Sequence, residues 1–210
     1  MKRRTFLKGS VVVLPAKALA GSQANSRVRL GLVGCGSRGN WIGNIFLRNT
    51  NSEITALADI FDDRLQEAGR RFKVPTSRRF KGFRAYEEVV SSDVEGVLIE
   101  SPPYCHPEQA EAAVKAGKHV FMAKPVAVDV WGCKVVGKAA EAAKNKVTFL
   151  VDFQTRAESK FKEAIRRVHK GAVGKPVCGQ VFYHTGRLPV RRTQKNASER
   201  AKRLRNWVFD

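Results

Sequence analysis

Hydrophobic positions fall into two alternating kinds of segment from residue 28 onward. Short apolar runs typical of buried strands occupy residues 28–33, 53–60, 94–100, 119–122 and 147–151. The segments between them place apolar residues on one helix face, as Leu65, Ala68 and Phe72 do at i, i+3 and i+7. This repeated alternation predicts an α/β fold in which a doubly wound parallel sheet is covered by helices on both faces.

In the later part of the chain the hydrophobic pattern makes more specific predictions. The helix after the fourth run is predicted to bury the apolar residues Val128, Trp131, Val135 and Ala139. A helix near residue 165 is predicted to face the core with the side chains of Phe161, Ala164, Ile165 and Val168. A strand over 177–183 is expected after it, whereas the basic residues 78–84 are predicted to form a loop.

A glycine-rich turn, Gly34-x-Gly36-x-x-Gly39, joins the first predicted strand to the first predicted helix. Gly-x-Gly-x-x-Gly is a common pattern, but its place between a predicted strand and a predicted helix favours a Rossmann-type, dinucleotide-binding fold. Gly34 would allow the tight turn, Gly36 the close approach of a pyrophosphate, and Gly39 the packing of helix on strand. The start of the helix, with Ser37 and Arg38, would offer N–H donors and a positive dipole end to the phosphates.

Asp59 ends the second predicted strand, about twenty residues beyond the glycine turn. A carboxylate at that place is suited to accept hydrogen bonds from the adenosine ribose. The alternative is a plain helix cap, because Asp62 starts the next predicted helix. Since a carboxylate would repel a 2′-phosphate, NAD is the expected cofactor, and Arg64 keeps NADP as the alternative.

Several further residues follow strands at the same edge of the predicted sheet, where ligands of such folds bind. The ones predicted to contact the cofactor are Ser101, Pro102, His106, Lys124, Pro125 and Gln154. Lys124 is also predicted to be catalytic, because a lysine held there by a following proline would hydrogen-bond a substrate hydroxyl and move its proton. Alternatives remain open for both residues. The alternative for Lys124 is chance placement, because the chain has 39 basic residues, and the alternative for His106 is a helix cap, because it begins a predicted helix.

A formal net charge of +20 makes nucleic acid or an anionic surface a partner to consider. Eight basic residues lie between 187 and 205 against one acid, Glu199. Few aromatic residues interleave with them, so a solvated loop and helix is favoured over a nucleic-acid-binding arm. The cysteines at 35, 105, 133 and 178 have neither metal-site nor disulfide-framework spacing, and no metal site is predicted.

The first twenty residues predict an export signal. Lys2, Arg3 and Arg4 precede a short apolar run at 9–14, and Ala18-Leu19-Ala20 matches a cleavage site. The paired arginines resemble the twin-arginine type, which is read by a receptor, and the apolar run is too short to span a bilayer. The expected product is a periplasmic or otherwise exported protein with no membrane span after cleavage. The alternative is a basic N-terminal arm.

From Arg27 onward the chain resembles the Gfo/Idh/MocA oxidoreductases. The resemblance is carried by VRLGLVGCGSRG, ITALADI, GVLIESPPYCHPEQAEAAVKAGKHVFMAKP and RRVHKGAVGKPVCGQV. It implies hydride transfer between NAD(P) and a hydroxyl-bearing carbon of a sugar, cyclitol or related polyol. It also implies that Lys124 lies by the nicotinamide and substrate, that His106 lies near the nicotinamide ribose, and that residues 152–154 border the nicotinamide pocket.

The resemblance implies three parts in the chain. Residues 1–25 would be a signal peptide and linker, 26–153 a Rossmann NAD(P)-binding domain, and 154–210 the truncated start of an α+β C-terminal domain for substrate and oligomer contacts. A homo-oligomer is expected where that domain is complete. One departure stands out, because Ala123 occupies the position of the family's glutamate. Two further hypotheses therefore remain: a nucleotide-binding module without turnover and, less favoured, a basic nucleic-acid-binding protein.

Overall fold

The computed structural model describes residues 27–186, 188, 190 and 196–209, so the predicted export signal lies outside the described residues. One sheet forms the centre of the molecule. Its strands are β1 (Val28–Val33), β2 (Ser52–Asp59), β3 (Arg79–Lys81), β4 (Gly96–Ile99), β5 (His119–Ala123) and β6 (Phe149–Asp152). They are ordered β3-β2-β1-β4-β5-β6, and every neighbouring pair is parallel. This is the doubly wound, Rossmann-type order, with its reversal between β1 and β4, so the predicted fold class is confirmed.

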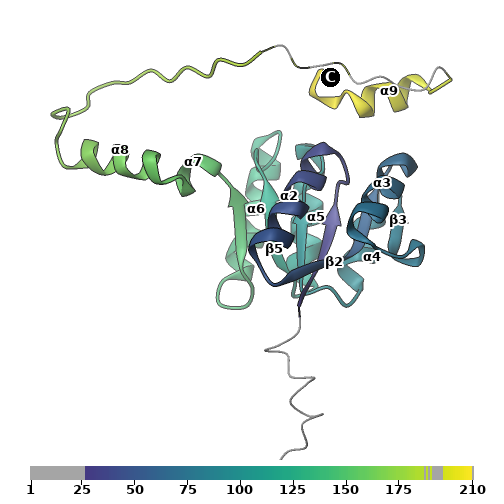
Figure 1. Ribbon diagram of the computed structural model, residues 1–210. Coiled ribbons are helices and arrows are strands. Elements are labelled where there is room, and N and C mark those ends of the chain that lie inside the picture. The colour runs from purple at the N-terminus through teal and green to yellow at the C-terminus, as the bar shows by residue number, and fades with distance from the viewer. Residues whose placement is uncertain (1–26, 187, 189, 191–195, 210) are drawn as a thin grey trace, which may run out of the picture.

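Helices cover both faces of the sheet (Figure 1). The helices of this domain are α2 (Ser37–Asn49), α3 (Asp62–Phe72), α4 (Ala85–Ser91), α5 (His106–Lys115) and α6 (Val130–Ala143). Short turns of 3₁₀ helix are η2 (Thr76–Arg78) and η3 (Pro103–Cys105). Beyond the sheet lie α7 (Gln154–Ala157), α8 (Ser159–His169), α9 (Glu199–Arg205) and η4 (Trp207–Phe209).

Two hydrophobic cores hold the layers together, one on each face of the sheet. On one face α2 and α3 pack through residues such as Ile42 and Leu65 against Leu32 and Leu98 of the sheet. On the other face α4, α5 and α6 pack against the opposite side of the same strands. The interior strands are buried on both sides, which explains their nearly continuous apolar sequence.

The basic stretch predicted as a loop contains a strand instead. β3 pairs in parallel with β2, its residue Phe80 lying opposite Ala58. The prediction missed it because a three-residue edge strand has only one partner and needs only one apolar side chain. Arg79 gains its own partners, since Nε and Nη2 donate to the carbonyl oxygen of Val74 at 2.8 and 2.6 Å.

The predicted core face of α6 is wrong except at Ala139. The buried positions are Gly132, Val136, Ala139 and Ala143, whereas Trp131 is 68% exposed. The helix begins with the Asp129 side chain accepting a hydrogen bond from the Gly132 N–H at 2.6 Å. Its inner side then packs on α5, where a Cβ on Gly132 would lie 3.0 Å from Cγ of Pro107. A Cβ on Gly132 would lie 2.8 Å from that of Ala127, so only glycine fits on the inner side.

The segment after the sheet departs from its prediction in two respects. Helix α8 forms, but its apolar face is not buried, because Phe161 and Ile165 are each 55% exposed. Residues 177–183 form no strand in the described structure, and Val181 is almost wholly exposed. A strand needs a neighbour to accept its backbone hydrogen bonds, and no strand lies beside this segment among the described residues. No described helix is long and apolar enough to cross a membrane.

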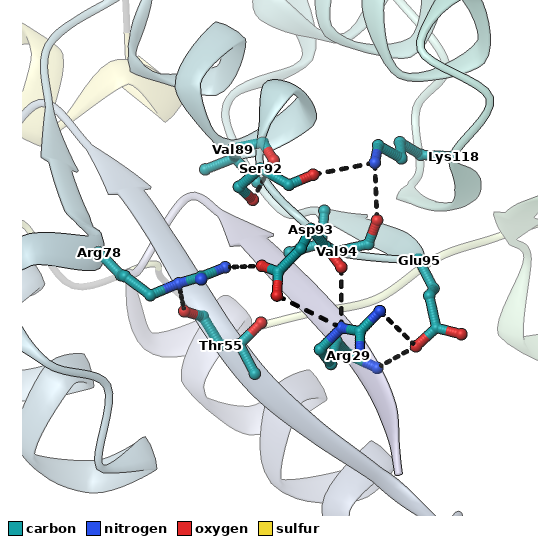
Figure 2. A network of polar contacts seen from close by, with 9 residues as sticks. All are labelled: Arg29, Thr55, Arg78, Val89, Ser92, Asp93, Val94, Glu95 and Lys118. Carbon is teal, nitrogen blue, oxygen red and sulfur yellow. Dashed lines mark hydrogen bonds and ion pairs between the residues drawn. The ribbon is translucent and has the colours of Figure 1, made fainter. Parts of the chain in front are cut away.

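A network of charges ties β1 to the turn before β4 at the amino-terminal edge of the sheet (Figure 2). Arg29 donates from Nε to the backbone oxygen of Asp93 at 2.8 Å and from its backbone N–H to Glu95 at 2.9 Å. Arg78 pairs with the Asp93 carboxylate and donates to the backbone oxygen of Thr55 at 2.7 Å. The hydrogen bond from Arg78 lowers the pKa of Asp93.

Candidate functional site: a cleft at the carboxyl ends of the strands

The glycine turn has the geometry that its sequence predicts. Gly34 has a φ of +93°, and a Cβ there would lie 2.6 Å from the backbone carbonyl carbon of Glu100. A Cβ on Gly39 would lie 1.9 Å from the carbonyl oxygen of Gly34, so α2 and β1 approach as only glycine allows. Among the described residues, a Cβ on Gly36 would meet only the Arg64 guanidinium within 4 Å, at an ordinary contact distance of 3.8 Å, so the turn is not crowded there. The tight turn and the helix packing are therefore confirmed.

Asn40 holds the turn in place. Its side-chain Nδ2 donates to the backbone oxygens of Cys35 and Gly36 at 2.9 and 3.1 Å. Helix α2 begins at Ser37, and no side chain among the described residues caps its start. An uncapped helix start directly after a glycine turn is suited to hold a phosphate.

Asp59 lies at the carboxyl end of β2 beside this turn and is buried. Its two oxygens accept hydrogen bonds from the backbone N–H groups of Cys35 and Phe61, each at 2.8 Å. Burial raises the pKa of Asp59, and those two hydrogen bonds and Arg64 oppose that shift. The carboxylate is thus fixed in one orientation, and each oxygen keeps a further lone pair for a ligand hydroxyl.

Two arginines lie over the ring of Phe61, next to Asp59. The Arg64 guanidinium is 4.7 Å from the ring centre and that of Arg205, on α9, is 4.2 Å from it. Arg205 also pairs with Asp63, at the start of α3. Helix α9 therefore closes over this side of the cleft, above the carboxyl ends of the strands in Figure 1.

His106 is wholly buried and lies behind the cleft. Its Nε2 is 2.9 Å from the backbone oxygen of Ser101, and its Nδ1 is 2.8 Å from that of Pro125. Burial lowers the pKa of this imidazole, and the two carbonyl contacts oppose the shift. His106 thus joins the segment after β4 to the segment after β5, while the Ser101 hydroxyl hydrogen-bonds Gln109 of α5 at 2.5 Å.

A cavity of about 300 Å³ lies where these segments meet. The predicted site residues in its wall are Gly34, Gly36, Ser37, Arg38, Asp59, Ser101, Pro102 and Lys124. Outside its wall are Gly39, which packs α2, His106, which lies behind it, Pro125 and Gln154. Lys124 thus shares one cavity with the glycine turn, although about 90 residues separate them in the sequence.

Glu100, Arg38 and Asp152 form a cluster that the sequence did not reveal. Nε of Arg38 lies 2.9 Å from Oε2 of Glu100, and its Nη2 pairs with Asp152. The Glu100 side chain has no exposed surface, and neither of its oxygens accepts a well-oriented hydrogen bond from any described residue. Burial, together with the charge of Asp152, raises the pKa of Glu100 to about 7, against the opposing effect of Arg38.

Position 123 lies between the two carboxylates of this cluster. Ile99 pairs with Met122 and Ala123 pairs with Asp152, so Glu100, the residue after Ile99, comes opposite Ala123. The family's glutamate is therefore absent from the end of β5, but a carboxylate lies at the end of each neighbouring strand. The only sequence signal was an acidic residue closing the apolar run VEGVLIE.

These residues fit a dinucleotide. The open side of Gly36 and the uncapped start of α2 offer space and N–H donors for the diphosphate. Asp59 and Lys124 lie in the wall of the same cavity, on either side of the point where the strand order reverses between β1 and β4. An extended ligand that crosses this point needs contacts on both sides. The doubly wound sheet and this cleft define a dinucleotide-binding Rossmann domain.

The chain belongs to the Gfo/Idh/MocA oxidoreductase family, described as an oxidoreductase family with an NAD-binding Rossmann fold, whose model matches residues 28–152. The predicted family resemblance is thereby confirmed. The chain is 30% identical over 163 residues to inositol 2-dehydrogenase 3 of Saccharopolyspora erythraea, covering 77% of this chain and 46% of that protein. It is 31% identical over 156 residues to glycosyl hydrolase family 109 protein 2 of Shewanella sp. strain ANA-3, covering 60% and 34%.

A solved structure shows the same fold. The chain superimposes on scyllo-inositol dehydrogenase of Lactobacillus casei, crystallised with NAD(H) and scyllo-inositol, with a TM-score of 0.62 and 25% identity. The match covers 71% of this chain and 43% of that one. The chain thus spans less than half the length of these relatives.

Proposed function

We propose that this chain carries the cofactor-binding part of an NAD-dependent dehydrogenase that oxidises a hydroxyl-bearing carbon of a cyclitol or related polyol. The observation that carries the proposal is the meeting of the glycine turn, Asp59 and Lys124 in one cavity wall. The names of the relatives support the substrate class, since one is an inositol 2-dehydrogenase and another was crystallised with scyllo-inositol.

Each part of the cleft has one role in this proposal. The start of α2, at Gly36 and Ser37, holds the diphosphate, and the carboxylate of Asp59 binds the hydroxyls of the adenosine ribose. NAD is preferred because a 2′-phosphate would meet that carboxylate, although the nearby Arg64 would partly offset the repulsion. The bound nicotinamide supplies the hydride acceptor.

Lys124 handles the proton of the substrate. When a hydroxyl-bearing carbon gives up hydride, the hydroxyl must lose its proton, and a group within hydrogen-bonding distance has to take it. Lys124 follows β5 directly and lines the cleft. Its segment is held from behind by the contact between Pro125 and the buried His106.

The test is nucleotide binding followed by turnover. Calorimetry of the full chain with NAD⁺ and NADP⁺ should show binding, with NAD⁺ the tighter ligand, and a panel of inositols and sugar alcohols should reveal NADH formation by absorbance. The variant Lys124→Ala should lower turnover by on the order of 10²–10⁴-fold.

Lys138→Ala is the matched control, because this lysine is exposed on α6, away from the cleft. It should leave both binding and turnover unchanged. Absence of binding of either nucleotide at millimolar concentration would contradict the whole proposal. Binding without turnover of any polyol would support the nucleotide-binding module instead.

We also propose that the protein is exported through the twin-arginine route. The support is the sequence of the first twenty residues, Arg3-Arg4 followed by a short apolar run and Ala18-Leu19-Ala20. Replacing both arginines by lysine should leave the full-length, unprocessed chain in the cytoplasmic fraction. Equal processing and export of that variant would argue against the route.

A further inference from the structure

We propose that the cluster of Glu100, Arg38 and Asp152 makes the cleft prefer the oxidised over the reduced dinucleotide, an inference that rests on the proposed function. The cluster acts as a buried negative charge beside the part of the cleft where the redox-active ring would lie. It is a determinant of cofactor redox-state preference and does not itself need to touch the ligand.

The sheet register places both carboxylates and their arginine on the same face. Side chains alternate between faces along a strand, and Ile99 lies in the core formed with α4, α5 and α6. Glu100 therefore turns to the α2 face, and Ala123 and Asp152 share that face by register. Arg38 comes from the first turn of α2, and its guanidinium pairs with both carboxylates.

The cluster carries a net charge of −1 when both carboxylates are ionised, because one guanidinium faces two carboxylates. The charged groups facing Glu100 are Arg38 from α2 and Asp152 from β6. The pKa of about 7 for Glu100 means that the net charge changes between −1 and 0 near neutral pH. Since the Glu100 side chain is fully buried, water screens this charge poorly.

The cluster lies on the side of the cleft away from Asp59. A dinucleotide crosses a doubly wound sheet at the reversal between β1 and β4. With its adenosine ribose at Asp59 on β2, its other half would extend over the ends of β4 and β5, where Glu100 and Lys124 line the cavity. The nicotinamide ring is cationic in NAD⁺ and neutral in NADH, so a buried negative charge there favours NAD⁺.

The decisive measurement is the ratio of the Kd of NADH to the Kd of NAD⁺ in the full chain, by calorimetry for NAD⁺ and fluorescence for NADH. At pH 8, Glu100→Gln should lower this ratio by about tenfold, since it removes the charge but keeps the shape. Asp152→Asn should lower it as well, which provides a second test if the first variant does not fold. In the unmodified chain the ratio should rise between pH 6 and pH 8, and Glu100→Gln should abolish that rise.

Glu95→Gln is the matched control. Glu95 precedes β4 as Glu100 follows it, and it pairs with Arg29 at the opposite edge of the sheet. This variant should keep the ratio and its pH dependence. If Glu100→Gln and Asp152→Asn both bind the two nucleotides with the unmodified ratio, the inference is overturned while the proposed function stands. If the unmodified chain binds neither nucleotide, both fall together.

Discussion

The two edges of the sheet use similar charged residues in opposite ways. At the amino-terminal edge, Arg29, Arg78 and Asp93 are partly exposed and connect to one another and to backbone oxygens (Figure 2). At the carboxyl-terminal edge, Glu100 is buried, paired only through Arg38 and left without a well-oriented hydrogen bond from the described residues. Exposed pairs cost little to form, whereas a buried carboxylate carries a desolvation penalty.

The contrast separates charged residues that stabilise the fold from a charged residue that reduces its stability. The amino-terminal network joins β1 to the turn before β4, and none of its residues lines the candidate cleft. At the carboxyl-terminal edge, burial disfavours the ionised form of Glu100 and raises its pKa to about 7, so this carboxylate reduces stability when it is ionised. If this contrast is right, substitutions at the amino-terminal edge should change stability alone, whereas substitutions at the carboxyl-terminal edge should change nucleotide binding as well.

The largest effect is expected from Gly39→Ala at the carboxyl-terminal edge. Its Cβ would lie 1.9 Å from the carbonyl oxygen of Gly34, so the turn and α2 must separate. We expect a loss of about 3 kcal/mol in the free energy of unfolding, together with loss of NAD⁺ binding. Urea unfolding and calorimetry would measure the two effects.

Gly137→Ala serves as the control for this change, because a Cβ on that helical glycine of α6 would meet nothing within 4 Å. It should raise stability by about 0.5–1 kcal/mol and leave binding intact. Unaltered NAD⁺ affinity in Gly39→Ala would show that the turn does not form the diphosphate site.

Glu100→Gln should have the next largest effect, and with the opposite sign for stability. The folded-state pKa of about 7 lies above the usual 4.5, so Glu100 destabilises the fold increasingly as pH rises from about 4.5 to 7. The amide variant should therefore be more stable than the unmodified chain by on the order of 2 kcal/mol at pH 8, and almost equally stable at pH 5. Thermal unfolding across this pH range checks the sign, and a variant less stable at pH 8 would contradict it.

The smallest effect is expected from Asp93→Asn at the amino-terminal edge. It weakens the pair with Arg78 in a partly exposed network, where such pairs contribute less than about 1 kcal/mol. Because the pKa of Asp93 is lowered in the folded protein, its contribution is present at neutral pH and lost as pH falls below the usual carboxyl range. Nucleotide affinity should not change. A large loss of affinity would mean that the two edges are energetically coupled and would contradict their separate roles.

Much of the cleft could be predicted from sequence because its elements depend on local rules. The turn at Gly34, the end of β2 at Asp59 and the segment after β5 at Lys124 each follow from a short pattern of glycines, apolar runs and prolines. The general rule for parallel sheets then places them at one edge. His106 shows the limit, because the pattern marked a helix start but not the wholly buried imidazole between two backbone oxygens.

Local sequence was enough to predict the succession of strands and helices, the glycine turn and the residues that end the strands, since periodicity and backbone freedom are properties of neighbours along the chain. Long-range contacts instead set the rotation of α6, the edge strand β3, the exposure of residues 177–183, and the meeting of Glu100, Arg38 and Asp152. Each of these depends on register or on a packing partner remote in sequence, and no local pattern records either.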